Sequence, residues 1–196
     1  MTSFASPSMS AAQDTSFARL TSLAVHDLRT PLATIFGFAR TMQRGAELEP
    51  PLSRYVEMII AASEQMTELL EELGLAARIA GDRYEPVLVD VDTLELARAA
   101  VPEAEGNGET ITTDPPTVQR ALALLALCAT RHGGVDQVSV HVDGAELTLA
   151  PVTDAAAPVI LGENMKDLGA AVAVSALRAL GGTVEVSGDA LRIKLA

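Results

Sequence analysis

Two long apolar stripes at helical spacing constrain the first part of this chain more than any other feature. In the first, apolar residues recur three or four positions apart: Leu20, Ala24, Leu28, Pro31, Ile35, Phe38 and Met42. In the second, the same spacing forms a heptad pattern: Tyr55, Ile59, Ala62, Met66, Leu69, Leu73 and Ala76. Gly45 ends the first stripe and Glu49-Pro50-Pro51 precedes the second. We therefore predict two long helices joined by a short turn.

Such a hairpin cannot bury an apolar face on each helix by itself. Each helix is about 40 Å long at 1.5 Å per residue, and a second copy would complete a four-helix bundle. We therefore predict a homodimer, with the hairpin spanning residues 14–81 from a plausible N-cap at Asp14 or Thr15. Residues 1–13 are expected to be a flexible tail.

Beyond Gly81 the pattern changes to short strand-like runs that alternate with helical ones. The predicted strands are 87–91, 109–113, 138–142, 146–150, 183–187 and 191–195, and the predicted helices are 92–101, 115–131 and 168–180. Asp143-Gly144 and Gly188-Asp189 are typical of tight hairpin turns. Residues 85–196 are therefore predicted to form an α+β fold, a two-layer sandwich with helices over one face of a mixed sheet.

Composition narrows the range of partners. The net charge is -12 and no run of Lys or Arg occurs, which argues against a nucleic acid or an anionic membrane as ligand. The single cysteine, Cys128, cannot form an intramolecular disulfide. No secretory signal is recognisable, and the longest apolar run, 121–129, is too short to cross a bilayer. We expect a cytoplasmic protein with protein partners.

The most distinctive short motif is HDLRTPL, from His26 to Leu32. If Leu28 is the centre of the buried stripe, His26 lies about 160° around the helix from it, so its imidazole should face solvent. Four residues share roughly that face and offer a cation, a hydroxyl and then a surface of low relief: Arg29, Thr30, Ala33 and Gly37. We assign a partner-docking role to Ala33, Gly37 and Arg40.

The proline and the acid beside this histidine point to chemistry. Pro31 should kink the helix within one turn of His26, because it clashes with the carbonyl of Asp27. A proline in the interior of a helix lowers the stability of the helix by roughly 3 kcal/mol. Such an unfavourable residue is more readily explained by a functional role than by packing alone. Asp27 can orient the imidazole or accept its proton, leaving the other ring nitrogen as a nucleophile. A phosphoryl group is the natural electrophile.

His26 to Leu32, followed by Ile35 and Gly37, resembles the phosphoacceptor box of the dimerisation domain of bacterial sensor histidine kinases. By that resemblance His26 is the phosphorylated residue, and Asp27 is the acid that assists proton removal. Thr30 is the position that in many family members orients water for phosphatase activity.

The resemblance continues beyond residue 85 but fails at the nucleotide site. Residues 114–129 resemble the helix that supplies two asparagines, one of which helps to hold Mg²⁺. Those asparagines fall on Leu124 and Cys128, and neither is the oxygen ligand that Mg²⁺ requires.

The glycine-rich segments of the family are also altered. Residues 152–159 resemble the box that reads adenine, and Asp154 is kept, but Ala156 and Pro158 stand at glycine positions. Asp167 precedes Gly169 where phosphates should meet a helix N-terminus, and its charge would repel them. We therefore predict a degenerate site that binds neither ATP nor a metal ion.

What remains for His26 is to exchange phosphate with another protein. The resemblance implies a histidine phosphotransferase, an enzyme that relays a phosphoryl group between the aspartates of response-regulator receiver domains, including that of a hybrid kinase. The receiver would supply Mg²⁺, and Arg29 is the nearest group for charge stabilisation. The alternative is a non-catalytic pseudo-histidine-kinase that binds a receiver domain or a partner kinase. The intact pair of His26 and Asp27 favours the first reading.

Overall fold

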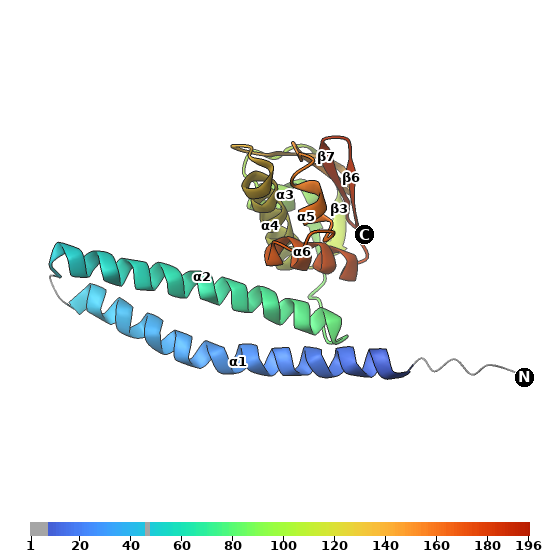
Figure 1. Ribbon diagram of the computed structural model, residues 1–196. Coiled ribbons are helices and arrows are strands. Elements are labelled where there is room, and N and C mark those ends of the chain that lie inside the picture. The colour runs from blue at the N-terminus through green and yellow to red at the C-terminus, as the bar shows by residue number, and fades with distance from the viewer. Residues whose placement is uncertain (1–7, 46–47) are drawn as a thin grey trace, which may run out of the picture. The chain divides into compact units, whose positions relative to one another are not determined.

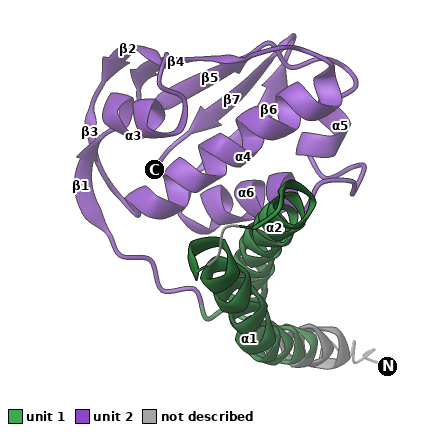
Figure 2. Ribbon diagram, turned by 90° about the vertical axis from the view of Figure 1, so that its left-hand side faces the viewer, with its two compact units in different colours: residues 1–83 green, residues 84–196 purple. Residues whose placement is uncertain are grey.

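The computed structural model describes residues 8–45 and 48–196, with side chains described from Phe17 onward. The chain divides into two compact units at Arg83 and Tyr84, shown in different colours in Figure 2. Each unit is treated separately below. Among the helices of the described ranges, none is long and apolar enough to cross a membrane.

The first unit is an antiparallel pair of long helices, α1 (Ser8–Gly45) and α2 (Pro50–Ala80) (Figure 1). Helix α1 begins at Ser8 rather than at Asp14 or Thr15, so residues 8–13, which were expected to belong to the tail, are helical. The segment contains Ala11, Ala12 and Gln13, which favour helix strongly enough to extend it. Residues 1–7 of the predicted tail lie outside the described residues. Helix α1 continues through Pro31 and is bent rather than straight in Figure 1, as an interior proline predicts.

The residues through which the two helices contact each other are not those of the predicted stripes. Helix α1 buries one residue every seven positions: Ala18, Val25, Leu32 and Ala39. Helix α2 meets them with Val56, Ile60 and Leu70, which join Val25, Leu32 and Ala39 in two small apolar clusters. The predicted stripes are therefore not the faces that meet inside the hairpin, because each helix has two adjacent apolar faces and only one can contact its neighbour.

The predicted stripes lie on the outside of the single hairpin. Nine large apolar side chains on them are exposed, and we call this set the outer stripe: Leu20, Leu28, Ile35, Phe38, Met42, Tyr55, Ile59, Met66 and Leu69. Exposed apolar side chains repeated along a helix in this way are typical of an interaction site. The outer stripe is thus the face that a second hairpin would cover in a four-helix bundle.

The second unit is a two-layer α/β fold, as predicted (Figure 2). Its main sheet has the strand order β2-β4-β5-β7-β6, and only the β2–β4 pair is parallel. The strands of this sheet are β2 (Glu105–Gly108), β4 (Ser139–Gly144), β5 (Glu146–Ala150), β6 (Thr183–Ser187) and β7 (Ala190–Lys194). A separate antiparallel pair joins β1 (Val89–Asp92) to β3 (Thr110–Thr113).

Helices pack on one face of the main sheet and enclose the core of the unit (Figure 2). They are α3 (Thr93–Ala100), α4 (Pro115–Gly133), the short α5 (Ala157–Ile160) and α6 (Leu168–Ala179). Leu122 and Leu125 of α4 are fully buried against sheet residues such as Leu147 and Ile193. This contact fixes which face of α4 meets the sheet. Another face of the same helix directs Leu124, Cys128 and His132 toward α6 and the segment before it.

Sequence reasoning missed strand β2. Its sequence, EGNG, contains none of the β-branched or aromatic residues that mark strands. Gly106 has φ of 125°, and a Cβ atom there would collide with the backbone of Val142 in the paired strand β4. The close approach of the two backbones therefore requires glycine. Because glycine has a low strand propensity, the sequence pattern did not predict this strand.

Gly106→Ala should destabilise the second unit by roughly 3 kcal/mol, because it adds a backbone clash to an unfavourable φ. Gly188→Ala is the matched control: Gly188 also has positive φ, 63°, but nothing lies within 4 Å of an added Cβ. Its expected cost is about 1 kcal/mol. Urea unfolding of the two variants measures the difference, and equal losses would contradict the assigned role of Val142.

Candidate functional site

His26 lies on α1 with its side chain 81% exposed. Its Nδ1 is 3.2 Å from Oδ1 of Asp27, the next residue in the chain. Within the described part of the chain no hydrogen bond engages Nε2. One ring nitrogen is therefore held by a carboxylate while the other is open to an incoming group, which is the arrangement a nucleophilic imidazole needs.

The neighbouring positions on α1 divide between two surfaces. Thr30 and Gly37 are exposed, and nothing lies within 4 Å of a Cβ added at Gly37. Arg29 and Ala33 instead line an open groove between α1 and α2, whose α2 side carries Glu64, Thr67, Glu68 and Glu71. The groove places the Arg29 cation beside a row of acids one helical turn from His26.

Arg40, assigned to docking from the sequence, is engaged inside the hairpin. Its Nη2 is 2.8 Å from Oε1 of Glu64, and its Nη1 donates to Oε1 of Gln43 at 3.1 Å. The guanidinium also stacks over Phe36, 5.1 Å from the ring centroid. Arg40 thus links α1 to α2, and its docking role stays a prediction.

In the second unit, the structure brings Leu124 and Gly169 together. A Cβ added at Gly169 would lie 2.8 Å from Cδ2 of Leu124. Leu124 therefore packs directly on the backbone at the start of α6. The side chain that stands at the predicted asparagine position fills the space beside the predicted glycine turn.

Asp167 is the N-cap of α6. Its Oδ1 accepts a hydrogen bond from the backbone N–H of Ala170 at 3.0 Å, and its side chain is only 8% exposed. Its Oδ2 lies 3.1 Å from Nε2 of His132 and 3.4 Å from Nη1 of Arg131. The helix N-terminus, which in a phosphate site would meet the anion, is already capped by an internal carboxylate.

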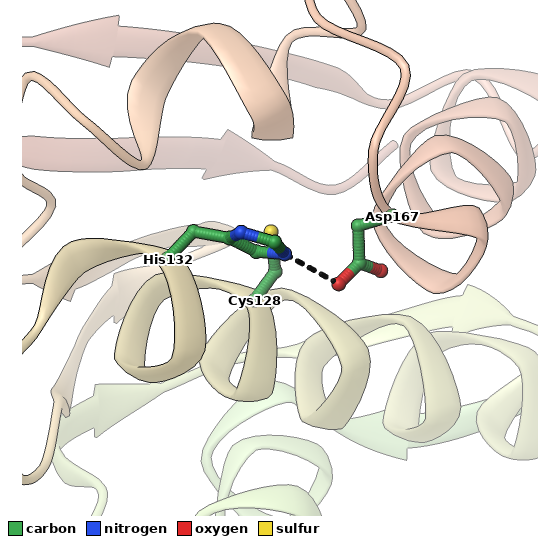
Figure 3. A group of neighbouring side chains, drawn as sticks. All are labelled: Cys128, His132 and Asp167. Atoms are coloured by element: carbon green, nitrogen blue, oxygen red, sulfur yellow. Dashed lines mark hydrogen bonds and ion pairs between the residues drawn. The ribbon is translucent and has the colours of Figure 1, made fainter.

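Cys128 is fully buried on α4, close to this carboxylate. Burial raises the pKa of the Cys128 thiol to about 12; the negative charge of Asp167 adds to the rise and Arg131 opposes it. Cys128, His132 and Asp167 form a compact group in which one donor atom of each lies within 4.8 Å of the others (Figure 3). Sequence reasoning found Cys128 and Asp167 but missed His132, although its spacing of four from Cys128 places the two on one helix face.

The remaining predicted nucleotide-site residues lie around the short helix α5. Ala156 is fully buried and packs 3.6 Å from the position of a Cβ added at Gly133. Pro158 is half-buried within α5, and Asp154 is exposed in the turn before it. Among the described residues, no hydrogen bond joins Asp154 to Asp167 or Cys128. The structure therefore groups Leu124 with Gly169 and Cys128 with Asp167, and leaves Asp154 apart.

The Cys128 thiol gives a prediction about pH. The unfolded thiol loses its proton near pH 9, whereas the folded one keeps it to about pH 12. Above about pH 9 the unfolded state binds fewer protons, so the free energy of unfolding should fall as pH rises toward 12. Cys128→Ala should lack this part of the decline. Urea unfolding of both chains at about pH 8 and about pH 10.5 tests this, and parallel pH dependence would contradict it.

Comparisons with known proteins match both units. The family model of the His Kinase A (phospho-acceptor) domain matches residues 18–81. The sensor-like histidine kinase SenX3 of Mycolicibacterium smegmatis is 29% identical over 101 residues, which cover 50% of this chain. The match spans only 26% of that relative's length.

Solved structures share the fold over most of the chain. The crystal structure of full-length ShkA in complex with AMPPNP is 21% identical, with a TM-score of 0.64 over 89% of this chain and 44% of that one. The Acinetobacter baumannii histidine kinase AdeS is 17% identical, with a TM-score of 0.56 over 87% of this chain and 97% of that one. The family match thus covers the helical hairpin, and the solved histidine kinase structures share the fold of the hairpin and of the α/β unit with its mixed sheet.

Proposed function

We propose that this chain is a histidine phosphotransferase, which relays a phosphoryl group between receiver aspartates through His26 and does not use ATP. The observation that carries the proposal is the exposed imidazole of His26, with Nδ1 3.2 Å from Asp27 and Nε2 open to solvent. A nucleophile presented in this way on a helix surface suits a phosphoryl donor that is carried by another protein.

The transfer step follows from this geometry. With the proton on Nδ1, the lone pair of Nε2 attacks the phosphorus of the receiver's aspartyl phosphate. The N–P bond forms as the P–O bond to the aspartate breaks, and the receiver's carboxylate leaves. Oδ1 of Asp27 stabilises the imidazolium that develops, or takes its Nδ1 proton. Transfer to the second receiver is the reverse reaction.

The charge on the transferring group has to be compensated by the partner and by this chain together. A Mg²⁺ ion held by the receiver would neutralise the phosphoryl oxygens, as phosphoryl transfer requires. On this chain Arg29, one helical turn beyond His26, is the cation that can approach the site from the groove. Most of the rate acceleration then comes from positioning His26 against the phosphoryl group, rather than from additional catalytic groups.

Two contacts and one buried side chain in the second unit support transfer without ATP. Leu124 packs on the backbone at Gly169, so the start of α6 is covered by an apolar side chain. Asp167 caps α6 and presents a carboxylate where a phosphate would bind. The buried thiol of Cys128 offers no hard oxygen ligand for Mg²⁺.

A two-part labelling experiment tests the proposal. The full chain is incubated first with radiolabelled ATP and Mg²⁺, and separately with receiver domains that carry labelled aspartyl phosphate. The proposal predicts label on the chain only in the second case. Label from ATP would replace it with an ordinary kinase, and receivers that bind without transferring label would favour a non-catalytic pseudo-histidine-kinase.

A further inference from the structure

Three metal-ligating side chains of different types converge at the start of α6 (Figure 3). Cys128 and His132 lie four residues apart on α4, so both side chains occupy one face of that helix. Asp167 reaches them from the N-cap position of α6. A thiol, an imidazole and a carboxylate thus meet between two helices that are far apart in the sequence.

The distances are close to those of a metal site. One donor atom from each of the three side chains lies within 4.8 Å of the other two. Nε2 of His132 and Oδ2 of Asp167 are 3.1 Å apart. Two ligand atoms about 2.0 Å from one tetrahedral ion are roughly 3.3 Å apart. The spacing of the imidazole and carboxylate atoms therefore already suits a shared ion, and a small reorientation of the two groups, with an approach of the sulfur, would complete the site.

The surroundings hold two of the donors in position. The N-cap hydrogen bond from Ala170 occupies Oδ1 of Asp167 and directs Oδ2 toward His132. Cys128 is fully buried and fixed by the helix packing around it. Such supporting contacts orient ligands before an ion arrives. Arg131 also contacts Oδ2, at 3.4 Å, but its side chain is 59% exposed and can turn to solvent when a cation takes its place.

We propose that Cys128, His132 and Asp167 bind a divalent ion of the Zn²⁺ type, with a water molecule as fourth ligand. Sulfur, nitrogen and oxygen together suit Zn²⁺, whereas Mg²⁺ takes oxygen ligands. On binding, the Cys128 thiol releases its proton to solvent and three coordinate bonds replace the contact between His132 and Asp167. The ion joins α4 to the start of α6, where sequence reasoning expected no metal.

Cobalt(II), a spectroscopic substitute for Zn²⁺ in such sites, gives a direct test with the untagged full chain. Because Cys128 is the single cysteine, a thiolate-to-cobalt charge-transfer band in the near ultraviolet can come only from this residue. We expect the band to saturate at one equivalent of Co²⁺ and to disappear when Zn²⁺ is added.

Variants separate this site from other metal binding. Cys128→Ser should abolish the band, and His132→Gln and Asp167→Asn should each weaken Co²⁺ binding by more than about 100-fold. Asp167→Asn keeps an oxygen for the cap of α6, so its fold is expected to persist. His141→Gln, on the exposed face of β4, is the control and should bind as the wild type does. Absence of the band at equimolar Co²⁺, or unchanged affinity in His132→Gln and Asp167→Asn, overturns the proposal.

Discussion

Replacing His26 with glutamine should abolish the transfer of label from a phosphorylated receiver domain to this chain. Glutamine keeps a polar side chain of similar length, but its amide nitrogen is not a nucleophile. Because the His26 side chain is 81% exposed, the substitution should change the free energy of unfolding by no more than about 0.5 kcal/mol. Acid-labile label on the chain after a short incubation measures the transfer.

His141→Gln is the matched control for this experiment. His141 is also exposed, but it lies on strand β4 of the second unit, where we assign it no role. Its variant should accept label at the wild-type rate. Asp27→Asn keeps a hydrogen-bond acceptor for Nδ1 but loses the charge, so transfer should slow by about 10²- to 10⁴-fold. Label that persists on the His26→Gln chain would show that another residue is the acceptor.

The helical hairpin could be predicted from the sequence, but the face through which its helices meet could not. Apolar residues at Leu28 and Ile35 and at Val25 and Leu32 follow the same period on adjacent faces of α1. Periodicity establishes that a helix is amphipathic without saying which of two apolar faces meets the neighbouring helix. The choice depends on side-chain fit with α2, which is a tertiary property.

The second unit shows the same division between local and tertiary signals. The hairpin of β4 and β5 follows from Asp143-Gly144, where Gly144 has the positive φ, 60°, that such turns need. Strand β2 has no local signal, because its glycines serve the approach to Val142.

The candidate sites differ in the same way. The motif from His26 to Leu32 is contiguous, so its resemblance to a phosphoacceptor box could be recognised in the sequence, and its chemistry stays a prediction. The group of Cys128, His132 and Asp167 could not, because its members come from two helices separated in the sequence. Sequence reasoning treated Asp167 only as a charge that repels phosphate. In the structure this carboxylate accepts a hydrogen bond from the backbone of Ala170 and contacts His132. It therefore caps α6 and is a candidate metal ligand.

A single charge in the outer stripe should separate the homodimer that the two apolar stripes predict. Ile59 is 40% exposed in one hairpin, so Ile59→Asp should leave the isolated hairpin folded. In a two-fold symmetric bundle the substitution occurs twice in one interface, and each carboxylate would lose water without gaining a partner. Burial of an unpaired charge costs several kcal/mol, so the dissociation constant of the dimer should rise by at least about 100-fold.

Ala61→Asp provides the same charge on the same helix. Ala61 lies two residues further along α2, about 200° around the helix axis from Ile59, and is exposed. This variant should remain a dimer. Light scattering at micromolar concentration then gives the mass of a monomer for Ile59→Asp and that of a dimer for Ala61→Asp. A dimer in both cases would mean that the bundle does not use the outer stripe, and a monomer in both would mean that added charge alone, rather than its position, separates the hairpins.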